Sequence, residues 1–169
     1  MQLLLVVEIP DKVKNEITVQ LQEMKKIYPQ FQWMKTAKYQ ILIQSFGSSF
    51  EAKKVIKRLE EVLYDKKSFF LYSHSVQLTI QDNITLYLDF QREKEIEKIN
   101  DQVREEFQVL ENGLKFIPHL VLANYKIPSK QQYFVIKKRI SKLVVDVSFK
   151  VSKLSLLEGD KKIHSFKLL

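Results

Sequence analysis

The chain of 169 residues contains no cysteine, only three glycines and only four prolines. The lack of cysteine excludes disulfide bonds, thiolate metal sites and thiol catalysis. The scarcity of glycine and proline leaves little room for long irregular loops. Long hydrophobic runs are missing too: the apolar run at residues 3–7 is too short to cross a bilayer, and no basic segment precedes it as in a signal peptide. We therefore expect a soluble, cytoplasmic protein that does not contact membranes.

What is present is a composition typical of a folded domain. Hydrophobic residues make up 45% of the chain and charged residues of both signs 28%, which supports a core and disfavours disorder. At this length we expect residues 1–169 to form one domain. The net charge of +8 favours polyanions such as RNA, DNA or anionic head groups. The alternative is that lysine-rich helix faces serve only solubility.

Hydrophobic periodicity predicts strands and helices in mixed order. We expect strands at residues 2–9, 31–35, 38–46, 69–80, 84–90, 114–125, 144–157 and 163–169, and helices whose apolar positions span 13–27, 52–63, 96–110 and 133–143. Two serines, Ser48 and Ser129, have Glu51 and Gln132 three residues later, the spacing of a capping box. Asn112-Gly113 is expected to end the third helix.

Each half of the chain offers a helix, then a strand with polar positions at its centre, then a second helix. Gln40 and His119 occupy matching places in these two strands, each of which precedes a serine-capped helix. This order of elements predicts an α+β fold of two similar lobes.

The run Phe116-Ile117-Pro118-His119-Leu120-Val121-Leu122-Ala123 resembles one half of the paired histidine signature of the 2H phosphoesterases, the LigT-like RNA 2′,3′-cyclic phosphodiesterases and 2′-5′ RNA ligases. The resemblance extends to residues 3–10, to residues 33–35 with 39–47, and to the C-terminal hairpin from residue 151. It implies a bilobal fold of two pseudo-symmetric antiparallel sheets with helices packed on the outside. It also implies that no metal or cofactor takes part.

In that family, two His-x-Thr strands face each other across a cleft. Side chains at i and i+2 of a strand share one face, so each imidazole projects together with its hydroxyl. One histidine then takes a proton, the other protonates the leaving oxygen, and the hydroxyls bind phosphate oxygens.

This chain departs from the pattern at several positions. Gln40 stands where the first histidine is expected, Leu42 and Val121 stand where the two threonines are expected, and Asn124 stands where an arginine often follows. Glutamine can donate and accept hydrogen bonds but cannot transfer a proton near neutral pH. Only His119 remains of the four motif side chains, so the acid–base pair is broken.

Other residues near these strands are candidates for holding a ligand. Lys38 and Lys126, together with Lys35 and Lys115, are expected near the ends of the two motif strands and close to a bound phosphate. Tyr39 and Tyr125 are candidates for stacking on bases. The alternatives are a solvated lysine face and aromatic residues that belong to the core, and for His119 itself a partly buried structural histidine.

Three functions stay open. The first is a degenerate protein that binds RNA or nucleotide phosphate ends, with hydrolysis weak or lost, as a monomer. The second is an active RNA 2′,3′-cyclic phosphodiesterase in which His119 acts with Gln40 and a lysine. The third is a protein-interaction module on the same scaffold. The loss of motif residues favours the first and third, and the basic charge favours the first. We expect Gln40 and His119 to face each other across one positively charged cleft.

Overall fold

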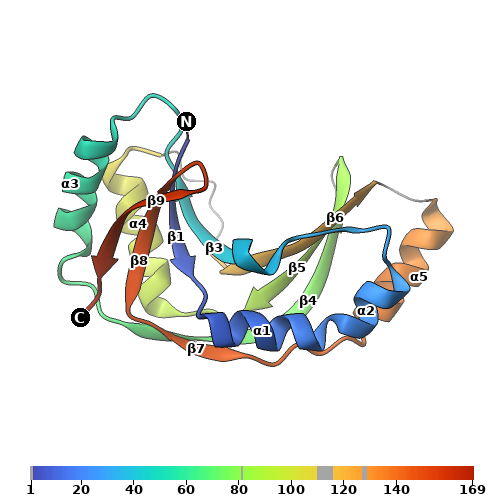
Figure 1. Ribbon diagram of the computed structural model, residues 1–169. Coiled ribbons are helices and arrows are strands. Elements are labelled where there is room, and N and C mark those ends of the chain that lie inside the picture. The colour runs from blue at the N-terminus through green and yellow to red at the C-terminus, as the bar shows by residue number, and fades with distance from the viewer. Residues whose placement is uncertain (1, 81, 110–115, 127–128) are drawn as a thin grey trace.

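The computed structural model describes residues 2–80, 82–109, 116–126 and 129–169 (Figure 1). Its strands are β1 Leu3–Glu8, β2 Gln32–Trp33, β3 Gln40–Ser45, β4 Phe69–Ile80, β5 Asn83–Phe90, β6 His119–Lys126, β7 Ser148–Val151, β8 Lys153–Glu158 and β9 Lys161–Lys167. Its helices are α1 Asp11–Gln20, α2 Gln22–Ile27, α3 Ala52–Leu63, α4 Lys94–Glu106 and α5 Lys130–Ile140, with a 3-10 turn, η1, at Thr36–Lys38.

The strands form two antiparallel sheets, one with the order β3-β1-β8-β9 and the other with the order β2-β6-β5-β4-β7. Figure 1 shows α3 and α4 beside the four-stranded sheet and α1, α2 and α5 around the five-stranded sheet. The predicted α+β class and the two antiparallel sheets are confirmed. Among the described residues, no helix is long and apolar enough to cross a membrane.

Hydrophobic patterning explains which side of each strand faces the core. β1 is apolar along most of its length because it lies inside the four-stranded sheet, between β3 and β8. β3 alternates instead, with Ile41 and Ile43 buried and Gln40, Leu42 and Gln44 at least partly exposed. Such alternation is typical of a strand with one solvated face.

The predicted strand at residues 144–157 is in fact two strands in two different sheets. β7 pairs with β4 of the five-stranded sheet, whereas β8 pairs with β1 and β9 of the four-stranded sheet. The chain changes sheets at Ser152, between them. Periodicity reports which face of a strand is buried and carries no information on its partner strand, so the sequence did not reveal this crossing.

The two predicted helix caps have different outcomes. Ser129 is the N-cap of α5, where its side chain accepts a hydrogen bond of 3.3 Å from the Gln132 amide, as predicted. The predicted cap at Ser48 is wrong, because α3 begins only at Ala52 and its N-cap residue, Glu51, makes no side-chain capping bond within the described residues. Gly47 at φ +72° turns the chain before the helix begins. The expected helix end at Asn112-Gly113 lies outside the described residues.

One buried polar side chain ties β3 to the helical layer. Asn100 on α4 is 1% exposed, and its Nδ2 donates a hydrogen bond of 2.9 Å to the Ile43 carbonyl. In the described part of the chain, β3 is an edge strand of its sheet, so this bond satisfies a carbonyl at an edge that lacks a neighbouring strand. The position of β3 therefore depends on α4.

We expect Asn100→Ala to lower the free energy of unfolding by about 1–3 kcal/mol, because it leaves the buried Ile43 carbonyl without its donor. Chemical denaturation measures this, with Gln102→Ala, at an exposed position of the same helix, as the matched control. Equal stability of the two variants would contradict the role assigned to Asn100.

Candidate functional site

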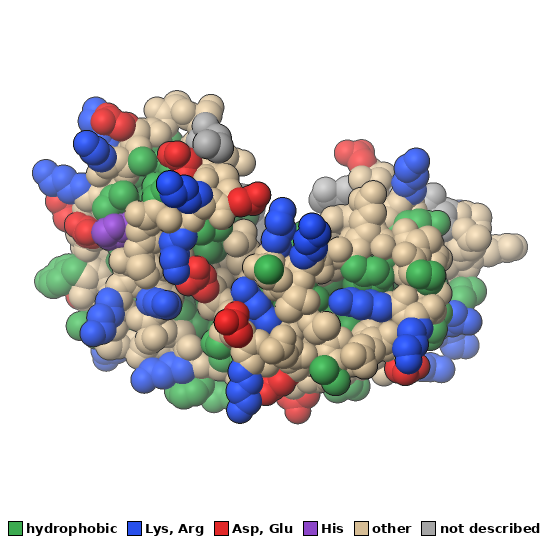
Figure 2. Space-filling model, viewed as in Figure 1, with side chains coloured by type: hydrophobic (Ala, Val, Ile, Leu, Met, Phe, Trp, Pro, Cys, Tyr) green, Lys and Arg blue, Asp and Glu red, His purple; other side chains and the backbone are tan. Residues whose placement is uncertain are grey.

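The two motif strands meet at a cleft between the two sheets. β3 and β6 lie in contact, and Figure 2 shows the surface hollowed between the lobe that carries α3 and the lobe that carries α5. The cleft has a volume of about 570 Å³ and is lined by Met34, Ala37, Lys38, Gln40, Leu42, His119, Leu120, Val121, Leu157 and Asp160. The structure thus brings together all four motif positions that the sequence singled out.

The two-residue period of the strands explains this convergence. Gln40 and His119 are each the first residue of their strand, and Leu42 and Val121 lie two positions further along on the same faces. Ile41 and Leu120, between them, are buried. Each strand therefore presents one polar side chain and one apolar side chain to the cleft, where a His-x-Thr strand would present two polar ones.

The hydrogen bonding of His119 defines which ring nitrogen can meet a ligand. His119 is exposed, and its Nδ1 lies 3.2 Å from the Ile117 carbonyl oxygen. A carbonyl can only accept, so Nδ1 carries the proton and donates. In the neutral ring, Nε2 is thus the free acceptor that a general base requires, and only the protonated imidazolium can donate from Nε2 to a phosphate oxygen.

Two residues of β5 surround His119 and were not singled out from the sequence. Asp89 is directly opposite His119 in the β5–β6 ladder, and the Tyr87 ring lies edge-on to the imidazole with 5.7 Å between ring centroids. Burial raises the pKa of Asp89, and the positive charges of His119 and His74 oppose this rise. Burial and the Asp89 charge raise the pKa of Tyr87. A titratable cluster therefore stands behind His119.

The charges that line the cleft are balanced, so the expectation of a positively charged cleft is wrong. Lys38 Nζ lies 3.7 Å from a carboxylate oxygen of Asp160, in the turn between β8 and β9. Both side chains are well exposed, and an exposed ion pair of this kind contributes little. Lys38 can therefore exchange Asp160 for a ligand phosphate at small cost.

Three other candidates do not reach this cleft. Tyr39 is 1% exposed, so its ring cannot stack on a base, and that prediction is wrong. Tyr125 stacks on Phe31 at 5.0 Å and lines a separate groove. Lys126 ends β6, roughly 20 Å along the strand from His119. Lys115 lies outside the described residues.

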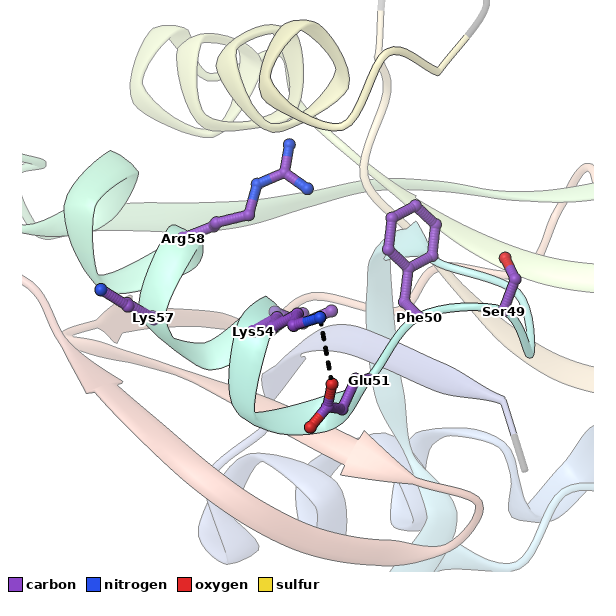
Figure 3. Close-up of a pocket in the computed structure, with 7 residues that line it drawn as sticks. Ser49, Phe50, Glu51, Lys54, Lys57 and Arg58 are labelled. Carbon is purple, nitrogen blue, oxygen red and sulfur yellow. Dashed lines mark ion pairs between the residues drawn. The ribbon is translucent and has the colours of Figure 1, made fainter.

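A further histidine and a second hollow have structural explanations. His164 pairs with Glu60 at 3.1 Å. The hollow at the start of α3, of about 370 Å³, contains Lys54 and Arg58 (Figure 3). Lys54 pairs with Glu51 at 3.4 Å, and Arg58 turns toward α4, where it pairs with Glu106 at 3.2 Å. These two cations are thus already matched by acids. No group of three or more His, Cys, Asp or Glu in the described part of the chain could hold a metal.

The fold of this chain, with two antiparallel sheets and five helices in its described residues, is shared with solved structures of LigT. Escherichia coli LigT in complex with 3′-AMP superposes with a TM-score of 0.75 at 11% identity, over 99% of this chain and 97% of LigT. LigT in complex with NADP+ gives a TM-score of 0.70 at 11% identity, over 99% and 97%. A Thermus thermophilus protein gives 0.72 at 13% identity, over 99% and 98%.

At these identities the likeness establishes the fold of the chain. No protein-family model matches the sequence, and no curated protein is similar to it in sequence. The architecture expected from the resemblance to the 2H phosphoesterases is therefore confirmed by structure alone.

We expect Asp89→Asn to stabilise the fold at pH 7. Because burial holds the pKa of Asp89 above its ordinary value of 3.8, the ionised carboxylate disfavours folding at neutral pH. This penalty fades as the pH falls through the raised pKa and is absent below the ordinary one. Thermal unfolding at pH 7 and at about pH 3 should show a gain in Tm that disappears in acid. Asp101→Asn, at an exposed position of α4, is the control, and destabilisation by Asp89→Asn at pH 7 would contradict the assignment.

Proposed function

We propose that the cleft between β3 and β6 binds the phosphate end of an RNA or nucleotide and hydrolyses it weakly or not at all. The observation that carries the proposal is the composition of the cleft: His119 and Gln40 face one cavity together with Leu42 and Val121. The scaffold of a phosphoesterase is kept, and two of the four side chains that would act on phosphate are apolar.

Binding and hydrolysis make different demands on these residues. A phosphate needs hydrogen-bond donors and positive charge, which the protonated His119 ring, the Gln40 amide and Lys38 supply. Hydrolysis also needs a second proton-transfer group, and Gln40 has none to offer. The absent hydroxyls remove donors that would stabilise the charge developing on the phosphoryl oxygens. Binding therefore survives the substitutions better than catalysis does.

The nucleotides held by LigT support this choice of ligand. Structures of LigT contain 3′-AMP, ATP, phosphate and NADP+, and the present cleft has enough volume, about 570 Å³, for a ligand of nucleotide size. The rival functions are an active 2′,3′-cyclic phosphodiesterase that uses His119 alone and a protein-interaction module that binds no nucleotide.

We expect 3′-AMP to bind in the cleft and His119→Ala to weaken this binding by roughly 10- to 100-fold, the effect of losing about 1.5–3 kcal/mol from a hydrogen bond to a charged group. Isothermal titration calorimetry measures the affinity. The matched control is His164→Ala, which removes a histidine of β9 that pairs with Glu60. Absence of binding to any of 3′-AMP, ATP and phosphate would favour the protein-interaction module.

The cleft lysine provides a second test. Lys38→Glu should weaken 3′-AMP binding, because it replaces a lysine that lines the cleft by a repelling carboxylate. The control is Lys53→Glu, with the same charge change at an exposed position of α3. Equal losses in the two variants would mean that only the net charge matters, and would contradict the location of the site.

We expect little hydrolysis of a 2′,3′-cyclic nucleotide by the natural chain, since loss of one proton-transfer group removes about 10²–10⁴-fold in rate. The triple variant Gln40→His, Leu42→Thr, Val121→Thr should gain measurable activity, because all three side chains face the cleft. Chromatography of the cyclic nucleotide and its monoester product measures both. Efficient turnover by the natural chain, abolished by His119→Ala, would establish the active phosphodiesterase instead.

A further inference from the structure

The net charge of the protein is concentrated in one segment of the chain. Residues 112–145 contain seven of the 28 lysines and arginines and none of the 20 aspartates and glutamates. This segment therefore carries +7 of the formal charge of +8. The rest of the chain is almost neutral. A basic surface of this kind attracts a polyanion through its phosphates and through counterion release.

The described part of this segment displays its charges on and around α5. Lys126, Lys130, Lys137, Lys138, Arg139 and Lys142 are exposed. Within the part of the chain that the structure describes, none of the six makes an ion pair with an acidic side chain, in contrast to Lys54 and Arg58 of α3. In Figure 2, Lys and Arg side chains outnumber Asp and Glu on the lobe that carries α5. These cations are available to a ligand.

The same helix exposes hydrophobic side chains that the fold does not use. Phe134 is 61% exposed and Val135 is 50% exposed. A helix face needed only for solubility would be expected to carry polar residues at these positions. The combination of these cations and exposed apolar side chains indicates a ligand with both phosphates and flat apolar groups.

A groove beside α5 offers a place for a flat apolar group of the ligand. It has a volume of about 290 Å³ and is lined by Tyr28, Gln30, Tyr125, Gln131, Gln132, Val135, Ile136 and Arg139. Behind its two tyrosines lies the buried Phe31, whose ring is 4.9 Å from that of Tyr28 and 5.0 Å from that of Tyr125. Arg139 Nη1 lies 3.4 Å from the Tyr28 hydroxyl oxygen, and the Arg139 guanidinium lies 5.9 Å from the Tyr28 ring centroid.

These groups are the ones that hold an unpaired base. The partly exposed Tyr125 ring and the Arg139 guanidinium plane offer stacking surfaces, the glutamine amides can pair with base edges, and the surrounding lysines meet the sugar–phosphate backbone. Tyr125 lies six residues along β6 from His119, which corresponds to roughly 20 Å. One mononucleotide cannot occupy both the cleft and the groove, whereas an RNA chain can.

We propose that the groove beside α5 binds an unpaired base of a single-stranded RNA, and that the ligand of the cleft is therefore the phosphate end of an RNA chain rather than a free nucleotide. This inference rests on the proposed function of the cleft. The exposed cations on and around α5 hold the RNA backbone, and the groove beside α5 holds one of its bases.

The test compares 3′-AMP with a single-stranded RNA of roughly eight nucleotides, within the site sizes of single-strand binders, that ends in a 3′-phosphate. Fluorescence anisotropy should show tighter binding of the oligonucleotide. The double variant Lys138→Gln, Arg139→Gln should weaken oligonucleotide binding by about tenfold and lower the salt dependence by about 0.7 per lost phosphate contact. The affinity of this double variant for 3′-AMP should equal that of the unmodified protein. The matched control is Lys53→Gln, Lys57→Gln on α3.

A second variant guards against effects of charge alone. Val135→Ser changes an exposed side chain that lines the groove without altering the charge. It should weaken binding of the oligonucleotide by a few fold and leave the affinity for 3′-AMP unchanged. Equal losses of oligonucleotide affinity in the α3 and α5 double variants would contradict the proposal that the groove binds RNA. An oligonucleotide that binds no better than 3′-AMP would contradict it too. If the protein binds vesicles of anionic phospholipid through α5, and the α5 variants leave the oligonucleotide affinity unchanged, the basic surface binds membranes and the proposal is wrong.

Failure of the cleft can be told apart from failure of the groove. If His119→Ala leaves 3′-AMP binding unchanged while the α5 variants still weaken the oligonucleotide, the proposed function of the cleft fails and the groove stands. If His119→Ala weakens 3′-AMP and the α5 variants do nothing, the cleft stands and the groove is rejected.

Discussion

The candidate site depends on the contact between two strands of different sheets, β3 and β6. Because side chains alternate along a strand, this contact places Gln40 with Leu42 and His119 with Val121 around one cleft. Among the described residues, β3 has no further strand of its own sheet on its outer side, and Asn100 of α4 satisfies its Ile43 carbonyl. The helical layer thus sets the position of the edge strand on which half of the cleft is built.

The cleft has two strands arranged as the His-x-Thr pattern requires, but only one of its four motif side chains is a histidine or threonine. His119 keeps a defined tautomer through Ile117 and sits against Tyr87 and Asp89. Its expected counterpart is an amide, and both hydroxyl positions are apolar. The cleft offers hydrogen-bond donors for an anion and, in Gln40, no second proton-transfer group, and for this reason we propose binding ahead of catalysis.

Much of the fold and part of the site could be predicted from the sequence. The alternation around Gln40 and His119 identified the faces of both strands, and the capping spacing of Ser129 marked the start of α5. Partners between strands could not be read from periodicity, so the sheet change at Ser152 and the pairing of Asp89 with His119 were missed. Tyr39 was assigned to the cleft because aromatic residues suit both cores and bases, and only the structure shows that it is buried.

The most direct test of the central claim is a crystal structure of the protein soaked with 3′-AMP. The account predicts the phosphate between β3 and β6, within hydrogen-bond distance of His119 Nε2 and the Gln40 side-chain amide, with Lys38 turned away from Asp160 toward it. A phosphate bound elsewhere, with the cleft filled only by solvent and the Lys38–Asp160 pair intact, would contradict it.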